Sequence, residues 1–506
     1  MWKFILAAFS ASGIVGLMVV LNPTALVTAL TAEPSMAQVP PPTLVHLFEW
    51  TWADIAAECE TYLGPNGYRA VQISPPQEHI VLPDFGYPWW QRYQPVSYQL
   101  ESRSGSRADL QAMIDRCRAV GVAIYADAVI NHMAGFEAGV GSAGTKFTKY
   151  EYPGLYGPDD FNDCRQQVTD YGNADNVTQC ELVGLADLNT SSKAVQRTLV
   201  DYMGDLVAMG VAGFRIDAAK HIRSAELGDI LAQLRDRYPD IDLYIYQEVI
   251  DPGTEAIRKQ DYYDSGNVID FKYGRFLGEA FLGLAGQTLA NLQTLGEGWG
   301  LAPSEQAVVF VDNHDKQRGH GGGGDYLTYH SGDLYALANV FMLGFPYGKA
   351  QVMSSFAFDD SEQGPPAEAD GSTRPVYQNG EANCFGEWVC EHRWPAIAGM
   401  VGFRNATQPQ TQVTDWWSNQ ANQIAFGRGD LGFVVINREA EPLSHTFQTQ
   451  LPQGRYCNVV QGSLVADGTA CANEAQVVLV NRVGQFTATL PAMSALAIHV
   501  DAKLSR

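Results

Sequence analysis

The chain has 506 residues, of which 46% are hydrophobic and 18% are charged, so it can bury a large core and is not intrinsically disordered. Its formal net charge is −23, from 33 basic and 56 acidic side chains. Because phosphate backbones and anionic lipid head groups repel so acidic a surface, this charge argues against a protein that binds nucleic acid or a membrane surface.

The N-terminus predicts a secretory signal peptide over residues 1–37. Lys3 precedes an apolar run over residues 4–21, and Ser35 and Ala37 supply the small side chains of a cleavage site. The run just reaches the length of a bilayer span, so an uncleaved anchor is the alternative. No later segment is long and apolar enough to span. We expect a secreted or periplasmic protein with no membrane contact after signal removal.

Eight cysteines follow the signal segment, and their even number in an exported chain favours disulfides. Buried free thiols are the alternative, because the sequence does not fix the pairing. A zinc site is not expected, since no close cysteine pair has further Cys or His at ligand spacing. Local spacing suggests the pairs Cys164 with Cys180, Cys384 with Cys390 and Cys457 with Cys471, which leaves Cys59 with Cys117.

Short apolar runs alternate with helical stretches from residue 43 onward. Alternation of this kind predicts a parallel sheet with helices outside it, and eight units favour a closed (β/α)8 TIM barrel over a doubly wound open sheet. Strands are predicted over residues 44–48, 70–73, 122–126, 213–216, 243–246, 268–271, 308–311 and 350–353, and helices over 51–62, with Thr51 as cap, 108–120, 193–209 and 224–238.

Two segments depart from this alternation. Residues 131–187 are too long for a plain loop, so we predict an inserted domain after the third strand. From about residue 414 helical stretches stop, and alternating runs such as 432–436 and 476–480 predict a C-terminal antiparallel β-sandwich. The predicted division is therefore a barrel over 38–130 and 188–413, an insertion over 131–187, and a sandwich over 414–506.

Polar side chains follow four of the predicted strands, at residues 127–132, 215–221, 247–248 and 312–315. Active residues of such barrels lie at the carboxyl ends of the strands, so Asp217, Glu248 and Asp315 are expected to converge there. Glycoside hydrolysis needs a proton donor and a second carboxylate. Arg215 is expected to lower the pKa of Asp217 and suit it to act as nucleophile. Structural ion pairs or a metal site are the alternative.

These motifs together resemble the α-amylases of glycoside hydrolase family 13, in particular the animal-type, chloride-dependent branch. The resemblance covers nearly the whole chain after the signal segment. It implies endo-hydrolysis of α-1,4-glucosidic bonds in starch and glycogen with retained configuration. A transglycosylase, a maltogenic exo-acting enzyme and an inactive glucan-binding protein are the alternatives. The matching stretches are residues 48–50, 71–76, 89–95, 127–132, 213–221, 247–250, 311–315, 317–320 and 384–394.

The resemblance assigns roles to individual residues. Asp217 matches the nucleophile, Glu248 the acid and base, and Asp315 the carboxylate that stabilises the transition state. The glycine-rich run 319–324 matches a mobile loop over the cleft. The implied substrate contacts are Trp89, Trp90, Tyr93, Gln94, His132, Arg215, Lys220, His221 and His314.

The family also implies a structural Ca²⁺ between barrel and insertion. The matching ligands are the side chains of Asn131 and Asp187 and the backbone carbonyls of Thr178 and His221. Simple loop capping by Asn131 and Asp187 is the alternative. The four cysteine pairs suggested by spacing agree with family pairs, and a fifth family pair has no cysteines here. We expect a monomer.

The chloride site is where this chain departs from the branch that it resembles. Arg215 and Asn313 match two of the chloride ligands, but Gln351 stands where an arginine is usual. A neutral amide removes one of two cations that would hold the anion. We therefore expect activity without chloride. Lys349, on the same strand face, is the residue that could replace the missing cation.

Overall fold

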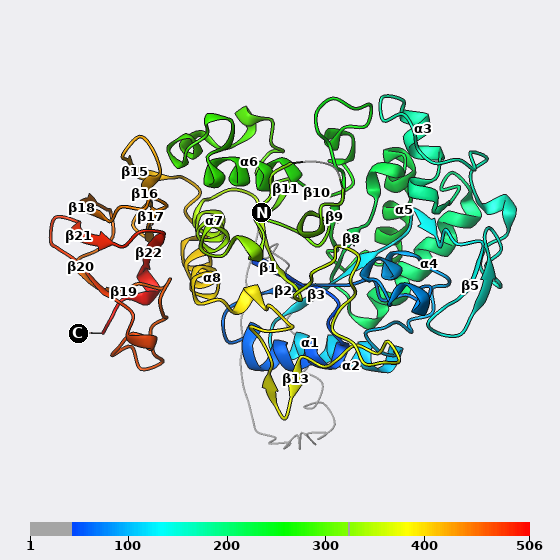
Figure 1. Cartoon of the computed structure of the whole chain (residues 1–506), viewed down its shortest axis with the longest axis horizontal. Helices are drawn as coiled ribbons and strands as arrows, with labels where there is room; N and C mark the ends of the chain where they lie inside the picture. Colours follow the sequence, from blue (N-terminus) through cyan, green and yellow to red (C-terminus); the bar gives the residue numbers. More distant parts are fainter. Residues whose placement is uncertain (1–42, 322–323, 506) are drawn as a thin grey trace, which may run out of the picture. The chain divides into compact units, whose positions relative to one another are not determined.

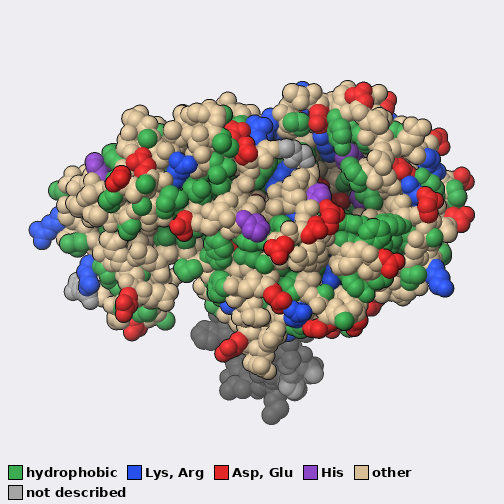
Figure 2. Space-filling model, viewed as in Figure 1, with side chains coloured by type: hydrophobic (Ala, Val, Ile, Leu, Met, Phe, Trp, Pro, Cys, Tyr) green, Lys and Arg blue, Asp and Glu red, His purple; other side chains and the backbone are tan. Residues whose placement is uncertain are grey.

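The computed structural model describes residues 43–321 and 324–505 (Figure 1). The predicted signal peptide lies outside these residues, as do two glycines of the run 319–324. Among the described residues, none of the helices has both the length and the apolar character needed to cross a bilayer. Acidic side chains are spread over the face seen in Figure 2, between hydrophobic and uncharged patches.

Eight parallel strands form a closed barrel, which confirms the predicted fold and excludes the open sheet. The barrel closes where β1 pairs with the last strand, with Leu44 opposite Gln351. All barrel-strand residues except Ala123, Asn267 and Lys349 are buried, as expected for a parallel sheet covered by helices. The strands are β1 (Thr43–Leu47), β2 (Ala70–Ile73), β3 (Ala123–Ala128), β8 (Gly213–Ile216), β9 (Tyr244–Gln247), β10 (Asn267–Ile269), β11 (Ala307–Phe310) and β12 (Lys349–Ser354).

Helices cover the barrel, and α1 (Trp52–Glu58) and α2 (Arg107–Ala119) begin at side chains that cap them. The Thr51 hydroxyl accepts from the amide of Asp54, as its predicted capping role requires. Ser106 and Asp109 form a reciprocal capping box. The sequence pattern does not single out α6, α7 and α8. The helices are α1 (Trp52–Glu58), α2 (Arg107–Ala119), α4 (Lys193–Met209), α5 (Ser224–Arg237), α6 (Phe271–Leu282), α7 (Asp333–Gly344) and α8 (Pro395–Thr407).

The chain between β3 and α4 leaves the barrel and forms a small irregular unit, coloured cyan in Figure 1. Two short antiparallel ladders organise it, one between β4 (His132–Met133) and β7 (Ala186–Asp187), the other between β5 (Ala138–Val140) and β6 (Lys146–Thr148). A helix, α3 (Ala174–Gln179), follows the longest loop of this unit. The β4–β7 ladder brings both ends of the excursion back to the mouth of the barrel.

The C-terminal strands form antiparallel sheets around their own core, which confirms the predicted sandwich. One sheet contains β15 (Thr414–Ser418), β16 (Gln423–Arg428), β17 (Gly432–Asn437) and β22 (Ser494–His499). Side chains such as Phe433, Phe447 and Phe486 fill the space between the sheets. The other ladders pair β18 (Leu443–Gln448) with β21 (Gln485–Leu490) and β19 (Gly454–Cys457) with β20 (Val477–Val480), and a hairpin before α8 pairs β13 (Tyr377–Gln378) with β14 (Glu381–Ala382).

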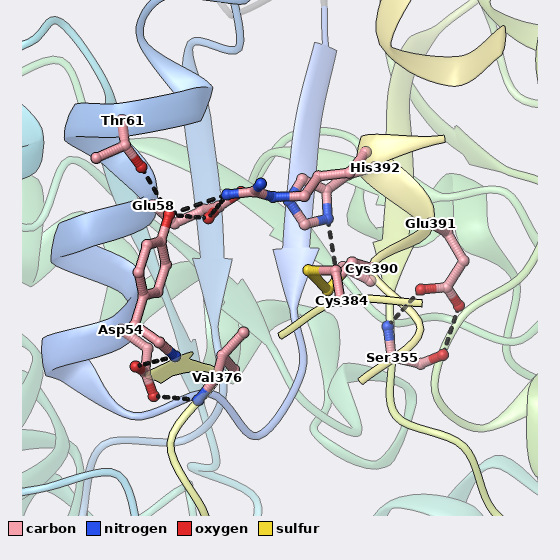
Figure 3. Close-up of a disulfide and its surroundings, with 12 residues drawn as sticks. Asp54, Glu58, Thr61, Ser355, Val376, Cys384, Cys390, Glu391 and His392 are labelled. Carbon is pink, nitrogen blue, oxygen red and sulfur yellow. Dashed lines mark hydrogen bonds and ion pairs between the residues drawn. A yellow bond between two sulfur atoms is a disulfide. The ribbon is translucent and has the colours of Figure 1, made fainter. Parts of the chain in front are cut away.

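All eight cysteines form the four disulfides suggested by their spacing, which excludes buried free thiols. The bridge between Cys384 and Cys390 lies close to a buried polar network (Figure 3). There Glu58 accepts hydrogen bonds from His392 and Arg393, which follow the bridge in the chain. This network attaches α1 to the segment that leads into α8.

Candidate active site

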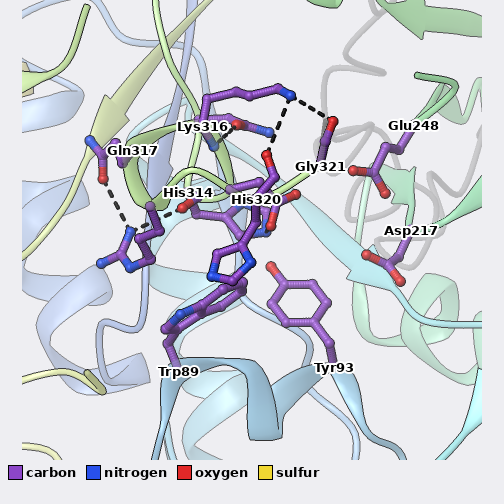
Figure 4. A network of polar contacts seen from close by, with 12 residues as sticks. Trp89, Tyr93, Asp217, Glu248, His314, Lys316, Gln317, His320 and Gly321 are labelled. Carbon is purple, nitrogen blue, oxygen red and sulfur yellow. Dashed lines mark hydrogen bonds and ion pairs between the residues drawn. The ribbon is translucent and has the colours of Figure 1, made fainter. Parts of the chain in front are cut away.

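A cleft of about 950 Å³ opens at the carboxyl ends of the barrel strands. It brings together Asp217, Glu248 and Asp315, the three carboxylates that were predicted to converge. Figure 4 shows the carboxyl groups of Asp217 and Glu248 near the ring of Tyr93. Of the predicted substrate contacts, the cleft is lined by Trp89, Trp90, Tyr93, Gln94, His132, Lys220, His221 and His314.

Arg215 lies beneath the cleft and is contacted by three carboxylates. Its Nη1 atom lies 2.6 Å from Asp127 Oδ1 and 2.9 Å from Asp217 Oδ1, and its Nη2 atom lies 3.1 Å from Glu248 Oε2. The amide of Ala218 also donates to Glu248 Oε2, at 2.8 Å. Arg215 can reach all three because the short parallel strands β3, β8 and β9 are adjacent in the barrel.

The electrostatics of Asp217 differ from the prediction. Burial raises the pKa of Asp217 well above its usual value, and the nearby charges of Glu248 and Asp127 raise it further, against the opposing effect of Arg215. Burial likewise raises the pKa of Asp127 to about 6. One guanidinium does not compensate three buried carboxylates. The cluster therefore favours the sharing of a proton among its carboxyl groups, so Asp217 is a carboxylate when that proton lies on a neighbouring carboxyl group.

Aromatic rings pack tightly on one side of the carboxylates. The Tyr93 ring stacks on His314 with centroids 5.1 Å apart, and Trp89 meets the same histidine edge-on at 5.5 Å. The Tyr93 hydroxyl donates to Asp127 Oδ2 at 3.0 Å. Burial lowers the pKa of His314, so the ring is neutral at neutral pH and can donate or accept.

His132 and Gln94 bind protein groups as well as facing the cleft. His132 Nε2 lies 2.9 Å from the carbonyl oxygen of Tyr93, which only accepts, so Nε2 carries the proton. The side-chain oxygen of Gln94 accepts from the amide of Gly135 at 3.0 Å. Both side chains therefore hold the inserted segment against the aromatic wall as well as lining the cleft.

Several lining residues carry no sequence signal of their own. Their side chains come from loops whose spacing shows no period, and only the closed fold brings them to the cleft. Glu362 is an example, because it follows β12 in the chain and yet binds the indole of Trp90 at 2.5 Å. Ala218 and Ile250 lie within matching stretches but had no role assigned, and the lining residues that the sequence did not indicate are Gly135, Phe136, Glu137, Tyr171, Leu182, Val183, Gly184, Leu185, Glu255 and Glu362.

The four expected calcium ligands lie where the inserted segment meets the barrel. Asp187 is buried beside Asn131, and its carboxylate accepts from Asn162 at 2.7 Å. His221 Nδ1 lies 2.9 Å from the carbonyl of Val177, the residue before Thr178. Burial raises the pKa of Asp187 and the nearby charge of Glu181 raises it further, against the hydrogen bond from Asn162. No cluster of three His, Cys, Asp or Glu side chains in the described ranges could hold a metal, so a cation here needs amide and backbone oxygens.

The residues that match a chloride site bind other protein groups. Gln351 Nε2 donates to Gln72 Oε1 at 2.6 Å, and the hydroxyl of Tyr246 donates to the same oxygen at 2.8 Å. Lys349 lies at the other end of β12, where its Nζ donates to the carbonyl of Glu305 at 2.7 Å. The ammonium of Lys349 is therefore bound to the carbonyl of Glu305, and this contact does not support the idea that Lys349 replaces the missing cation.

The chain matches two family models, the α-amylase catalytic domain over residues 61–246 and the α-amylase C-terminal all-β domain over 416–501. The α-amylase of Tribolium castaneum is 48% identical, covering 91% of this chain and 94% of the relative. That of Thermomonospora curvata is 47% identical, covering 94% and 76%. A solved structure of α-amylase I from Eisenia fetida, a variant in complex with maltohexaose, superimposes with a TM-score of 0.85 at 41% identity, covering 91% of this chain and 98% of that one. These similarities, over a barrel whose three carboxylates meet in one cleft, show that the chain belongs to the α-amylase family.

Proposed function

We propose that the protein cuts internal α-1,4-glucosidic bonds of starch, glycogen and related glucans by a retaining double displacement. The observation that carries this proposal is the convergence of Asp217, Glu248 and Asp315 in one cleft, with Arg215 beneath two of them. A pair of carboxyl groups suffices for retaining hydrolysis. The third carboxylate adds negative charge facing the oxocarbenium-like transition state.

In the first step Glu248 donates its proton to the glycosidic oxygen while Asp217 attacks the anomeric carbon. The bond from that carbon to the leaving oxygen breaks, and a covalent glucosyl ester of Asp217 forms. Arg215 contacts Asp217 Oδ1, so we assign the attack to Oδ2. Glu248 Oε2 is held by Ala218 and Arg215, so we assign the transferred proton to Oε1. In the second step Glu248 takes a proton from water, whose oxygen displaces Asp217.

The test measures hydrolysis of soluble starch by the wild type and by D217N and E248Q. Each substitution should lower kcat by at least about 1000-fold, because each removes a group that acts only in the transition state. D205N, at an exposed ion pair with Arg107, is the control and should leave kcat unchanged. Short internal fragments with α configuration should appear early. Products longer than the substrate indicate a transglycosylase, and maltose alone from the start indicates an exo-acting enzyme.

We also propose a structural Ca²⁺ held by Asn131, Thr178, Asp187 and His221. The donor set fits the ion, because Ca²⁺ prefers carboxylate, amide and carbonyl oxygens. Rotation of the Asn131 amide would present its oxygen toward Asp187. When bound, the cation neutralises the buried carboxylate of Asp187 and joins the inserted segment to the barrel.

The finer placement in the animal-type branch is also a proposal, together with activity independent of chloride. Gln351 supports the independence from chloride, because a neutral amide already bound to Gln72 offers no charge to an anion. The experiment compares starch hydrolysis after dialysis against chloride-free buffer and after chloride is restored, with calcium present in both. Equal rates support the proposal, and activity only with chloride refutes it.

The protein's surroundings and domain division complete the proposal. Four disulfides support secretion or a periplasmic location, because such bonds persist in oxidising compartments. We propose that the barrel over 38–130 and 188–413, the insertion over 131–187 and the sandwich over 414–506 act as one monomer on a neutral glucan. Size-exclusion chromatography with light scattering tests the monomer.

A further inference from the structure

Lys316 follows the catalytic Asp315 directly and turns its ammonium group back toward the glycine-rich run. The side chain is only 7% exposed. Its Nζ donates to the carbonyl of Gly321 at 2.6 Å and to that of His320 at 3.3 Å, as Figure 4 shows. The same ammonium lies 5.4 Å from the ring centroid of Phe271 and 5.1 Å from that of Tyr326, both within reach of a cation–π contact.

The segment that Lys316 holds lies against the catalytic machinery. The amide of His320 donates to the carbonyl of Asp315 at 2.9 Å. Gly321 has φ +71°, which favours glycine, and a Cβ built on it would lie 3.3 Å from Ile250 Cδ1 and 3.7 Å from Asp315 Cβ. Residues 315–321 therefore form a compact turn whose carbonyls converge on one ammonium group.

The turn continues into the aromatic wall of the cleft through His320. Its ring meets Trp89 edge-on, with centroids 5.6 Å apart. Its Nε2 lies 3.1 Å from one oxygen of Glu362, whose other oxygen binds the indole of Trp90 at 2.5 Å. A chain of contacts thus runs from Lys316 to the two tryptophans expected to stack on glucose.

We propose that Lys316 is a positioning residue that holds His320 and Gly321 against Asp315 and thereby sets the affinity of the cleft for a glucan chain. This proposal rests on the proposed glucan hydrolase activity. Glycines at 319 and 321 give the turn little stiffness of its own, so two charge-assisted hydrogen bonds supply the order. Substrate then meets a wall that is ordered before binding, which raises affinity without a new contact to the sugar.

The experiment compares K316M and K316R with the wild type and with K349M. Methionine keeps the length of the side chain and removes the charge, whereas arginine keeps a charge and donors. Lys349 is a matched control, because its ammonium also donates to a backbone carbonyl, that of Glu305, and lies 5.9 Å from the Tyr244 ring, at the other end of the barrel. The measurements are kcat and KM on maltohexaose and hydrogen exchange of peptides that cover residues 315–321.

K316M should raise KM by about 3- to 10-fold and change kcat by less than about 2-fold, since uniform binding is lost. Exchange at residues 315–321 should become faster. K316R should restore most of the wild-type KM and of the wild-type exchange rate, and K349M should change neither KM nor exchange.

Unchanged KM and exchange in K316M overturn the proposal. So does a shifted pH profile of kcat/KM with unchanged exchange, because Lys316 would then act through its charge on Asp315 and Glu248. A wild type without glucan hydrolysis refutes the proposed function instead, and the exchange comparison still tests whether Lys316 orders the turn.

Discussion

Gln351 stands where the proposed chloride independence can be tested at a single side chain. Its amide and the hydroxyl of Tyr246 both donate to Gln72 Oε1, inside the barrel. The amide nitrogen of Gln72 in turn donates to Asp127, which belongs to the carboxylate cluster around Arg215. We expect Q351R to make activity respond to chloride, because a second guanidinium beside Arg215 supplies the missing charge-assisted donor. The measurement is the rate of starch hydrolysis as chloride is added to a chloride-free enzyme.

Q351M controls for the loss of the amide and should show no chloride response. A chloride response equal in wild type and Q351R would mean that Arg215 alone holds the anion. A Q351R enzyme that ignores chloride would show that the new guanidinium binds Gln72 or Asp127 rather than an anion.

Protonation of Glu58 is expected to destabilise the fold at low pH. Burial favours its neutral form, but hydrogen bonds from His392 and Arg393 outweigh burial and lower the pKa of Glu58 from 4.5 to about 2. A depressed folded-state pKa stabilises the fold above the unfolded value, and this contribution is lost as pH falls from about 4.5 toward 2. The shift corresponds to about 3 kcal/mol at neutral pH.

E58Q should therefore lower Tm at about pH 7 and flatten its fall between about pH 5 and pH 3. Thermal unfolding followed by circular dichroism measures this. E60Q is the control, because Glu60 pairs with Arg116 at the surface and its loss should matter little. Parallel Tm curves for wild type and E58Q would assign the acid limit to other groups.

The direction of the pKa shift of Asp217 could not be predicted from the sequence. The sequence shows that Arg215 and Asp217 lie two residues apart on one strand, and this spacing predicts a lowered pKa of Asp217. The structure adds burial and the charge of Asp127, which comes from another strand, and the direction reverses. Residue types and their strand positions were thus predictable, whereas their titration depends on neighbours that only the closed barrel brings together.

Among the elements, those with a clear apolar pattern were predictable and those without were not. The helix predicted over 193–209 is α4, with the same bounds, because its apolar face repeats with the helical period. In α7 nearly every position is apolar, because the helix is buried between the barrel and other packed elements, so no period marks it. The strand expected over 268–271 corresponds to the three-residue β10, and Phe271, the last residue of the expected strand, already begins α6.

The ends of α7 and α8 depend on Arg428, which comes from β16 of the sandwich. Its guanidinium donates to the carbonyls of Gly344 and Thr407, the last residues of α7 and α8, and to that of Gln410 just beyond α8. Helix-end carbonyls need such donors when they are buried. We expect R428M to lower the free energy of unfolding by about 3 kcal/mol, since it removes the Arg428 donors from all three carbonyls, of which that of Thr407 keeps the amide of Gln410.

Thermal unfolding of R428M and of R455M, an exposed position on β19, tests this. R428M should lower Tm by several degrees and keep wild-type kcat at low temperature, because the cleft is built from other segments. An equal Tm for both variants would contradict the role of Arg428 as a link between sandwich and helices.

At the scale of the whole molecule, the cleft is assembled from loops that are far apart in sequence and held by lysines. Lys149 donates to the carbonyl of Gly184, Lys220 to that of Ile250 and Lys316 to that of Gly321. In each case the ammonium is largely buried and donates to a backbone carbonyl, and Lys149 and Lys220 also pair with Glu181 and Glu255. No sequence motif predicts such contacts, because every residue has a backbone carbonyl whatever its side chain. The sequence therefore predicted the catalytic centre of the cleft better than its rim.

The junction of barrel and insertion gives the last prediction. If Ca²⁺ binds Asp187 with Asn131 and two carbonyls, removal of the ion leaves a buried carboxylate without a cation. A ligand present at 100 times its Kd stabilises the fold by about 2.7 kcal/mol. EGTA should therefore lower Tm, and added calcium should restore it. D187N should have the lower Tm already and should not respond to EGTA.

The control is D163N, an exposed aspartate in the same inserted segment, which should respond to EGTA as the wild type does. Hydrogen exchange locates the effect: peptides that cover α3 and β7 should exchange faster without calcium, and those of β17 in the sandwich should not. An EGTA response that is equal in D187N and wild type would place the ion elsewhere, and uniform acceleration in β17 would show that the insertion and sandwich unfold together. Local acceleration confined to α3 and β7 follows only if the ion joins the insertion to the barrel, because a cation between two segments stabilises both of them and nothing beyond their contact.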